Sequence, residues 1–227
     1  MTTSSEHLET LAQTLEATGD YRIIRRLKPR PHIVPPPGAP LRLGLVVDVE
    51  TTGLDPQRDE VIELAMTPFN YGLDGTVFSV GDSFQGLRQP SEPIAPEITA
   101  ITGITNEMVA GAPTFAEVFP KFLDFVGGAY LVAQNAKFDM SFIMKHMVQN
   151  KISRPFEVYD TIHFSKRCFP EESRHNLDLI CKRLNLEMES GDLRHRSIGD
   201  VRLTAKAFLL LRDRLGDNLP PREKWTI

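Results

Sequence analysis

An apolar run at residues 43–47 is the clearest strand signal in the chain, because Leu and Val dominate it and a Thr52-Gly53 turn follows it. Residues two apart on a strand point to the same face, so Asp48 and Glu50 at the end of this strand should project together. Two adjacent carboxylates repel each other unless a proton or a cation lies between them. The pattern therefore predicts a buried strand with a candidate site for a hard cation, Mg²⁺ or Mn²⁺, at its carboxyl end.

Further along the chain the periodicity predicts four more strands and several helices. Strands are expected at residues 60–71, 76–87, 130–133 and 157–159, and the Asp74-Gly75 pair joins the first two of these as a hairpin signal. Helices are expected as short turns over 93–111 interrupted by Gly103, as one helix from Thr114 with Glu117 in a capping box to Gly127, as another entered at Asn135 and running to about 149, and at 161–168, 176–184 and 197–215. Strands that begin as a meander and are then separated by helices predict an α/β fold with a mixed sheet flanked by helices.

Residues 1–40 have a different character and are expected to form an N-terminal extension. Apolar residues at helical spacing predict a helix within residues 4–17, a basic segment follows at 21–30, and six prolines between Pro29 and Pro40 make an extended linker. The basic segment is either a contact for a phosphate backbone or a solvated surface. The remaining chain is expected to divide into one domain at 41–218 and a short C-terminal tail at 219–227.

Composition narrows the class of protein. With 227 residues, 41% hydrophobic and 25% charged, the chain suits one large globular domain plus an extension. It contains no apolar stretch of the roughly 20 residues that span a bilayer, and no secretory signal, so we expect a cytoplasmic protein. Cys168 and Cys181 lack metal-site spacing and should be free thiols. A net charge of −4 argues against coating nucleic acid through bulk charge, but an enzyme with acidic metal ligands remains compatible with it.

Two later stretches supply candidate partners for the first acid pair. Asp139 follows the fourth strand, and ligands of open α/β sheets bind outside the carboxyl ends of strands, so it should approach the first pair. In the segment 195–200, His195 is expected on a loop, Ser197 as a candidate helix N-cap and Asp200 in the first helical turn. Taken singly, an Asp-x-Glu pair on a strand is usually surface decoration and a lone Asp at a helix start is commonly a cap or dipole partner. A single histidine is most often structural or exposed.

As an ordered set, three segments closely resemble the exonuclease motifs of the DEDDh 3′–5′ exonucleases, a group that includes the proofreading epsilon subunits of bacterial DNA polymerase III, RNase T and the oligoribonucleases. The segments are Asp48-Val49-Glu50-Thr51-Thr52-Gly53, Asn135-Ala136-Lys137-Phe138-Asp139 and His195-Arg196-Ser197-Ile198-Gly199-Asp200. The resemblance covers about residues 43–215. Accessory matches lie at residues 101–105, at Asp160-Thr161, at Leu177-Asp178 with Cys181, and at Thr204.

The resemblance implies an RNase H-like fold with a five-stranded mixed sheet, and hydrolysis of terminal phosphodiester bonds that releases nucleoside 5′-monophosphates. Two divalent ions, Mg²⁺ or Mn²⁺, roughly 3.5 to 4 Å apart would assist the attack of water. By family analogy, Asp48 bridges both ions, Glu50 and Asp200 complete the site of the attacking water, and Asp139 helps to hold the second ion. His195 would be the general base, since histidine exchanges protons near neutral pH.

The same resemblance implies the substrate contacts. Thr51, Thr52 and Leu54, in the turn after the first motif, would meet the terminal nucleotide, and Asn135 and Lys137 are candidates for a phosphate contact. Phe138 is assigned to core packing in preference to base stacking. Many relatives have His-Asn before the acid of the second motif, whereas this chain has Gln134 before Asn135, which leaves a contact made by that histidine in doubt.

Several alternatives stay open at this point. The substrate is expected to be single-stranded 3′ ends, with DNA favoured and an RNA-trimming exoribonuclease as the alternative. If the substrate is DNA, the protein is either a proofreading subunit or a stand-alone repair enzyme. The short stretch after the last helix favours the stand-alone enzyme. A partner-binding module with a vestigial nuclease core and a two-metal phosphatase are disfavoured by the complete motif set. A homodimer, and a polymerase or repair partner bound through residues 1–40, are further hypotheses; no membrane association is expected.

Overall fold

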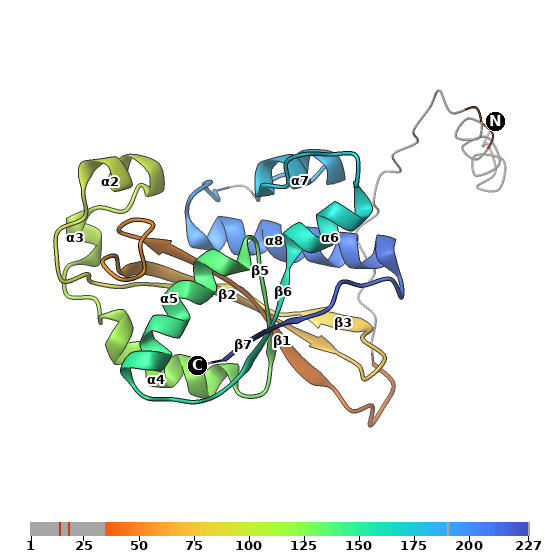
Figure 1. Ribbon diagram of the computed structural model, residues 1–227, viewed down its shortest axis with the longest axis horizontal. Coiled ribbons are helices and arrows are strands. Elements are labelled where there is room, and N and C mark those ends of the chain that lie inside the picture. Colours follow the sequence, from red (N-terminus) through yellow and green to blue (C-terminus); the bar gives the residue numbers. More distant parts are fainter. Residues whose placement is uncertain (1–13, 15–17, 19–34, 190, 227) are drawn as a thin grey trace.

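The computed structural model describes residues 14, 18, 35–189 and 191–226, and in this part of the chain a mixed sheet lies between two layers of helices (Figure 1). The predicted N-terminal helix and the basic segment lie outside the described residues, Thr14 excepted. Within the described part, no helix has the length and apolar character needed to cross a bilayer.

The sheet combines an antiparallel meander with two parallel strands, as the sequence predicts. Strand β1 (Arg42–Thr51) pairs antiparallel with β2 (Val61–Tyr71), and both β3 (Val77–Val80) and β4 (Phe84–Leu87) pair antiparallel with β2. On the other side of β1, β5 (Tyr130–Ala133) and β6 (Phe156–Asp160) run parallel to it, and β7 (Glu223–Trp225) closes the edge antiparallel to β6. The order β3-β2-β1-β5-β6-β7 places β1 in the interior of the sheet.

The expected number of five strands is corrected to seven in the part of the chain that the structure describes. The stretch 76–87 forms two strands that follow one another along β2, because the strand pairing is interrupted at residues 81–83. Across this interruption the Gly81 N–H donates to the Pro68 carbonyl at 2.8 Å, and the Ser83 hydroxyl bonds the Thr67 hydroxyl at 2.6 Å. The second additional strand, β7, lies within the segment 219–227 that was expected as a tail. Its three residues are two charged side chains followed by one tryptophan, which is too little apolar pattern to predict a strand.

The helices agree closely with their predicted positions. They are α2 (Pro96–Thr102), α3 (Asn106–Val109), α4 (Phe115–Val126), α5 (Ala136–Gln149), α6 (Thr161–Cys168), α7 (Leu177–Leu184) and α8 (Ser197–Leu215). Gly103 ends α2 at φ 70°, a left-handed conformation that glycine adopts without steric cost. The predicted capping box of Thr114 and Glu117 opens α4.

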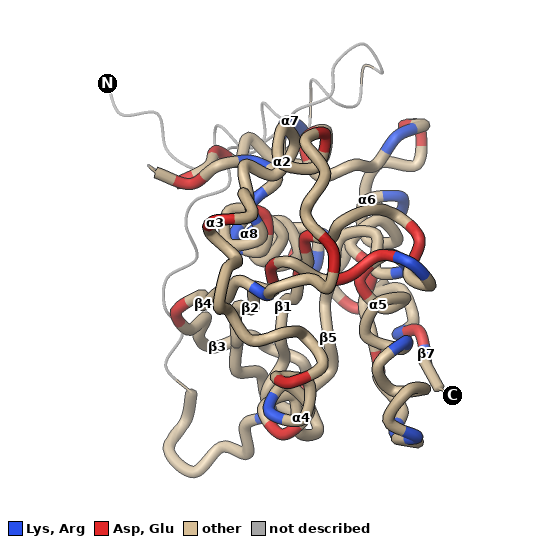
Figure 2. The backbone as a smooth tube through the Cα atoms, turned by 90° about the vertical axis from the view of Figure 1, so that its left-hand side faces the viewer, with Lys and Arg blue, Asp and Glu red and all other residues tan. Residues whose placement is uncertain are grey.

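Apolar side chains cover both faces of the central strands. Val47 and Leu131 pack with Phe119 and Phe142 on the α4 and α5 side, while a second cluster around Phe208 packs on the α6 and α8 side. Burial on both faces explains the continuous apolar run of β1 and fixes the strand that carries the first acid pair. Acidic and basic residues are interspersed along the chain in Figure 2, and Cys168 and Cys181 are free thiols, as expected.

Candidate active site

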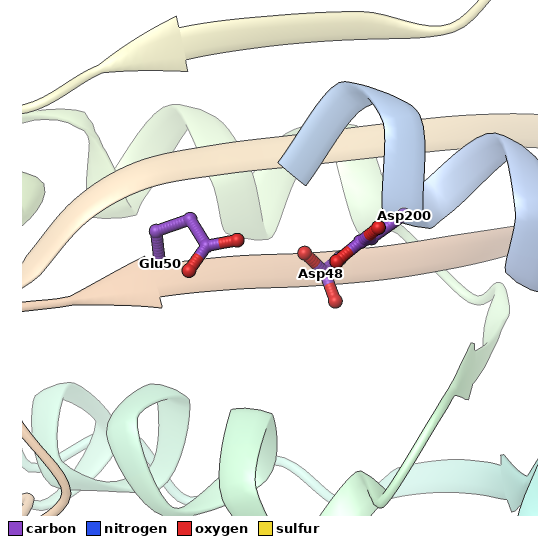
Figure 3. A group of neighbouring side chains, drawn as sticks. All are labelled: Asp48, Glu50 and Asp200. Atoms are coloured by element: carbon purple, nitrogen blue, oxygen red, sulfur yellow. The ribbon is translucent and has the colours of Figure 1, made fainter. Parts of the chain in front are cut away.

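Three carboxylates converge at the carboxyl end of β1. Asp48 and Glu50 project from the same face of this strand, and Asp200 reaches them from the first turn of α8 (Figure 3). One oxygen of each carboxylate lies within 4.8 Å of the others. The structure thus brings together residues that are about 150 positions apart in the chain, at the edge where the parallel strands β1, β5 and β6 end.

This cluster is electrostatically costly without a cation. Burial raises the pKa of Asp48 well above its usual range, and the neighbouring carboxylates of Asp139, Glu50 and Asp200 raise it further. Burial, followed by the charges of Asp200 and Glu63, raises the pKa of Glu50 to about 8. Closely spaced oxygen donors that hold their protons this strongly suit a divalent hard cation, which would replace the protons and neutralise the repulsion.

Asp139 lies beside this group without being part of the compact trio. It is 2% exposed in the first turn of α5, and its Oδ1 accepts a hydrogen bond from the Val49 N–H, between Asp48 and Glu50, at 3.1 Å. Burial raises its pKa, and hydrogen bonds from its own N–H and that of Val49 counteract the increase. The second motif therefore approaches the first, as predicted, and Asp139 contacts the β1 backbone between the two acids of the first motif.

The first turn of α5 is held in place by Asp160, at the end of β6. Its carboxylate accepts from the N–H groups of Asn135 at 3.1 Å and Ala136 at 3.0 Å, and also from that of Ile162 at 2.9 Å. A carboxylate at a helix N-terminus satisfies otherwise unpaired N–H groups and favours the helix dipole. Asp160 therefore positions the turn that carries Asp139.

His195 precedes α8, as predicted, and lines a cavity of about 510 Å³ together with Asp48, Asn135 and Asp200. Its backbone is in the left-handed region at φ 60°, and its N–H donates to Asp200 Oδ2 at 3.3 Å. A non-glycine residue in this region costs of order 1–3 kcal/mol and is found where the surrounding structure enforces it. The strained turn places the imidazole and the Asp200 carboxylate on the same cavity.

A buried ion pair fixes the start of α8 and replaces the expected N-cap. The predicted cap, Ser197, is instead the first helical residue, and Arg196 at the cap position makes no side-chain cap. The fully buried Glu63 carboxylate on β2 accepts from the Ser197 N–H at 2.9 Å and from the Arg196 guanidinium at 2.7 and 3.2 Å. Glu63 thus caps a helix from a different strand, a contact that local spacing could not show.

A second arginine lies within the acid cluster. The Arg194 guanidinium donates to Asp178 at 2.6 Å and also pairs with Asp200, and it lines the same cavity. These two carboxylates raise the pKa of Arg194 although its burial opposes that shift. The sequence analysis assigned no role to Glu63, Arg194 or Arg196. Glu63 alone carried a signal of such a role, because it is a lone acid within the apolar stretch of β2.

The turn after β1 has its polar groups engaged internally. The Thr51 hydroxyl donates to the Gly53 carbonyl at 2.5 Å, and the Thr52 hydroxyl contacts Asp59 at 3.3 Å and accepts from the Glu60 N–H at 3.0 Å. Leu54 is 83% exposed at the tip. Of the five predicted substrate contacts, these three therefore form one rigid turn with an apolar tip, which is a surface suited to an aromatic base.

The other two predicted contacts separate. Asn135 is exposed on the cavity, at φ 63°, whereas Lys137 is exposed but does not line this cavity. Gln134, where the resemblance implies a histidine, is bonded within the protein: it donates to the His175 carbonyl at 2.9 Å and accepts from the Thr161 hydroxyl at 2.5 Å. Phe138 packs on the core, against Phe142, as assigned.

Comparisons with known proteins identify relatives of this chain. The family model described as exonuclease, of the RNase T type, matches residues 45–208. A DNA polymerase III of the PolC type from Bacillus cereus is 38% identical over 171 residues, which are 74% of this chain and 11% of that protein. A DNA polymerase III subunit epsilon-like protein from Rhodobacter capsulatus is 38% identical over 170 residues, 74% of this chain and 23% of that protein. The chain therefore spans only a fraction of the length of these relatives.

Solved structures show the same fold. Exonuclease X, in complex with 5′ overhanging duplex DNA, aligns with a TM-score of 0.59 at 24% identity, covering 78% of this chain and 94% of that one. A full-length 3′-exonuclease aligns with a TM-score of 0.63 at 19% identity, covering 82% and 90%. The RNase H-like architecture expected from the motifs is thereby confirmed.

Proposed function

The chain belongs to the exonuclease family whose model matches residues 45–208, and on this premise we propose that it is a metal-dependent 3′–5′ exonuclease acting on single-stranded ends, with DNA favoured as the substrate. The observation that carries the proposal is the convergence of Asp48, Glu50 and Asp200 within 4.8 Å, with His195 on the same cavity. Such a group combines a site for divalent ions with a side chain able to accept a proton.

Each residue has a distinct task in this proposal. Asp48, Glu50 and Asp200 would hold divalent ions, assisted by Asp139, which is hydrogen-bonded to the β1 backbone at Val49. When bound, two such ions supply neutralisation of the phosphodiester charge and activation of water. His195 accepts the proton of the attacking water, and its orientation depends on the N–H bond to Asp200 and on the strained turn.

The terminal nucleotide is recognised by the turn after β1. Leu54 offers an exposed apolar contact to the base, while the internal bonds of Thr51 and Thr52 hold the backbone of the turn in one conformation. Because these hydroxyls are already engaged, the contact to the nucleotide falls to backbone groups and to the Leu54 side chain. Such recognition carries little base-specific hydrogen bonding, which suits an enzyme that removes successive nucleotides of any sequence.

The test uses 5′-labelled single-stranded DNA and RNA incubated with the full chain in Mg²⁺ or Mn²⁺. We expect a ladder shortened from the 3′ end, lost in EDTA and in the isosteric variant Asp200→Asn. Asp217→Asn makes the same chemical change at an exposed position and should be fully active. Absence of shortening with every polymer in both metals would refute the proposal, and faster RNA than DNA degradation would select the exoribonuclease.

The role of His195 needs a separate measurement. His195→Gln should reduce kcat by about two to four orders of magnitude, the usual contribution of a positioned general base, while leaving Mn²⁺ binding intact. Unchanged kcat would assign the histidine a structural role. Should the protein bind a partner but show no turnover even with all acids present, the binding-module hypothesis would replace the enzyme.

A further inference from the structure

The cavity extends well beyond the acid cluster, and only on one side of it. Its volume of about 510 Å³ falls within the 300–1,000 Å³ of typical ligand sites. From Asp48 it runs along the carboxyl ends of β5 and β6 to α6 and the loop before α7, and no residue of the turn 51–60 lines it. In Figure 1, α6 and α7 accordingly lie across the molecule from α2 and α3.

The part of the cavity next to α6 and α7 carries a cation among polar and apolar side chains. Lys166 of α6 lines it with Ser173 and Asn176 of the α6–α7 loop, together with the apolar Ile162 and Leu177. The cavity's other cation, Arg194, is already paired with Asp178 and Asp200. Lys166, in contrast, forms no ion pair with any residue in the described part of the chain. Its ammonium group is therefore the lining cation that is available to an anionic ligand.

This wall is rigidly built. His175, 8% exposed, bonds the Ser165 hydroxyl through Nδ1 at 2.9 Å and the Glu172 carbonyl through Nε2 at 3.0 Å. Its own carbonyl accepts from the Gln134 amide at 2.9 Å, which ties the loop to the end of β5. Because both ring nitrogens and the carbonyl of His175 are bonded, the loop presents its neighbouring side chains in one geometry. This lowers the entropic cost of binding a ligand.

Resting on the proposed function, the geometry points to a binding subsite for the nucleic-acid backbone: we propose that Lys166, Ser173 and Asn176 bind a phosphate on the 5′ side of the scissile bond. If the terminal nucleotide contacts the turn 51–54 on the β2 side and the scissile phosphate lies at the acids, the rest of the strand must leave on the opposite side. The cavity along β5 and β6 is that exit, and Lys166 supplies the charge that attracts the polyanion there.

The test compares Lys166→Gln with Lys121→Gln, which removes one exposed positive charge on α4, remote from the cavity. On an oligothymidylate, Lys166→Gln should raise KM about fivefold to tenfold at nearly unchanged kcat, and reduce the salt dependence of kcat/KM by about 0.7 in slope. On the p-nitrophenyl ester of thymidine 5′-monophosphate, which has no upstream phosphate, both variants should match the wild type. Equal KM values for the oligonucleotide, or an equal loss on the ester, would overturn the subsite.

A substrate series locates the phosphate and keeps the two proposals separable. Replacing single upstream phosphates by neutral methylphosphonates should abolish the difference between wild type and Lys166→Gln at one position, and a difference that persists at all positions would contradict the contact. Fluorescence anisotropy of the same oligonucleotide in EDTA measures binding without turnover. Lys166-dependent binding in a protein that hydrolyses nothing would sustain the subsite and refute the nuclease, whereas binding that is absent or independent of Lys166 would refute the subsite.

Discussion

Glu63→Gln should be the most informative single substitution outside the acid cluster. The change keeps the size of the side chain and removes its charge, so that the Arg196 guanidinium loses its ionic partner. Glu63 is fully buried, and the Arg196 side chain is only 18% exposed. Breaking a buried pair by removing one partner costs about 3–5 kcal/mol, because the remaining charge is left without compensation. Since Arg196 keeps some contact with water, we expect the lower end, about 3 kcal/mol.

That loss is large against a total free energy of unfolding of about 5–15 kcal/mol. For a domain of about 150–250 residues, each kcal/mol shifts Tm by about 2–4 °C, so Tm should fall by about 6–12 °C. Differential scanning calorimetry in EDTA measures this without reference to any activity. Glu157→Gln is the matched control, because Glu157 pairs with Arg222 at the surface and should contribute about 0–1 kcal/mol.

The same substitution tests how the third motif is positioned. Residues 196 and 197, which Glu63 holds, lie between His195 and Asp200, so loosening them should lower kcat at a temperature where the variant remains folded. The double variant Glu63→Gln/Arg196→Gln removes the uncompensated charge and should regain part of the stability without regaining kcat. A melting temperature of Glu63→Gln within about 1 °C of that of Glu157→Gln would contradict a stabilising Glu63–Arg196 pair, since the smallest effect that we expect is about 6 °C.

Three further predictions concern the site. The pKa of Glu50 rises from 4.5 to about 8 on folding, so the folded protein holds a proton that the unfolded chain releases. Stability in EDTA should therefore fall as pH rises from about 4.5 to about 8. A melting temperature that does not change over this pH range would contradict the prediction. Arg194→Gln should bind Mn²⁺ more tightly by calorimetric titration, because the guanidinium no longer competes for Asp200, and weaker binding would contradict this. Gly199→Ala should cost about 1–3 kcal/mol in denaturant unfolding, because its Cβ would lie 2.6 Å from the Leu193 carbonyl oxygen; wild-type stability would show that the loop yields freely.

The sequence alone was sufficient for the parts of the molecule whose signals are local. The apolar run of β1, the capping box of Thr114 and Glu117 and the left-handed Gly103 each depend on residues within a few positions, and the structure confirms all three. The parallel pairing of β1 and β5 followed from a general rule for α/β sheets, and it correctly brought Asp139 next to the first acid pair.

Features that depend on distant partners were beyond local reasoning. Strand β7 has three residues and is held by its antiparallel pairing with β6. The guanidinium of Arg222, just before it, lies 4.6 Å from the Tyr130 ring centroid and 5.4 Å from that of Tyr159. The start of α8 looked like a serine cap because Ser197 had the right spacing, but a carboxylate 134 residues away performs that task. A long-range contact of this kind leaves no periodic trace in the chain.

The two arginines beside His195 explain how the chain tolerates its acid cluster. Asp48, Glu50, Asp139 and Asp200 all lie close together, and the first three have raised pKa values because burial and mutual repulsion disfavour their charged forms. Arg194 and Arg196 lower the pKa of Glu50, yet each guanidinium is anchored by a carboxylate of its own, Asp178 and Glu63. Asp178 and Glu63 thus hold the compensating charges beside the cluster, and a cation that binds the facing carboxylate oxygens competes with Arg194 at Asp200. Replacing the repelling acids by amides should therefore stabilise the fold while abolishing metal binding, a trade-off expected where strain is retained for function.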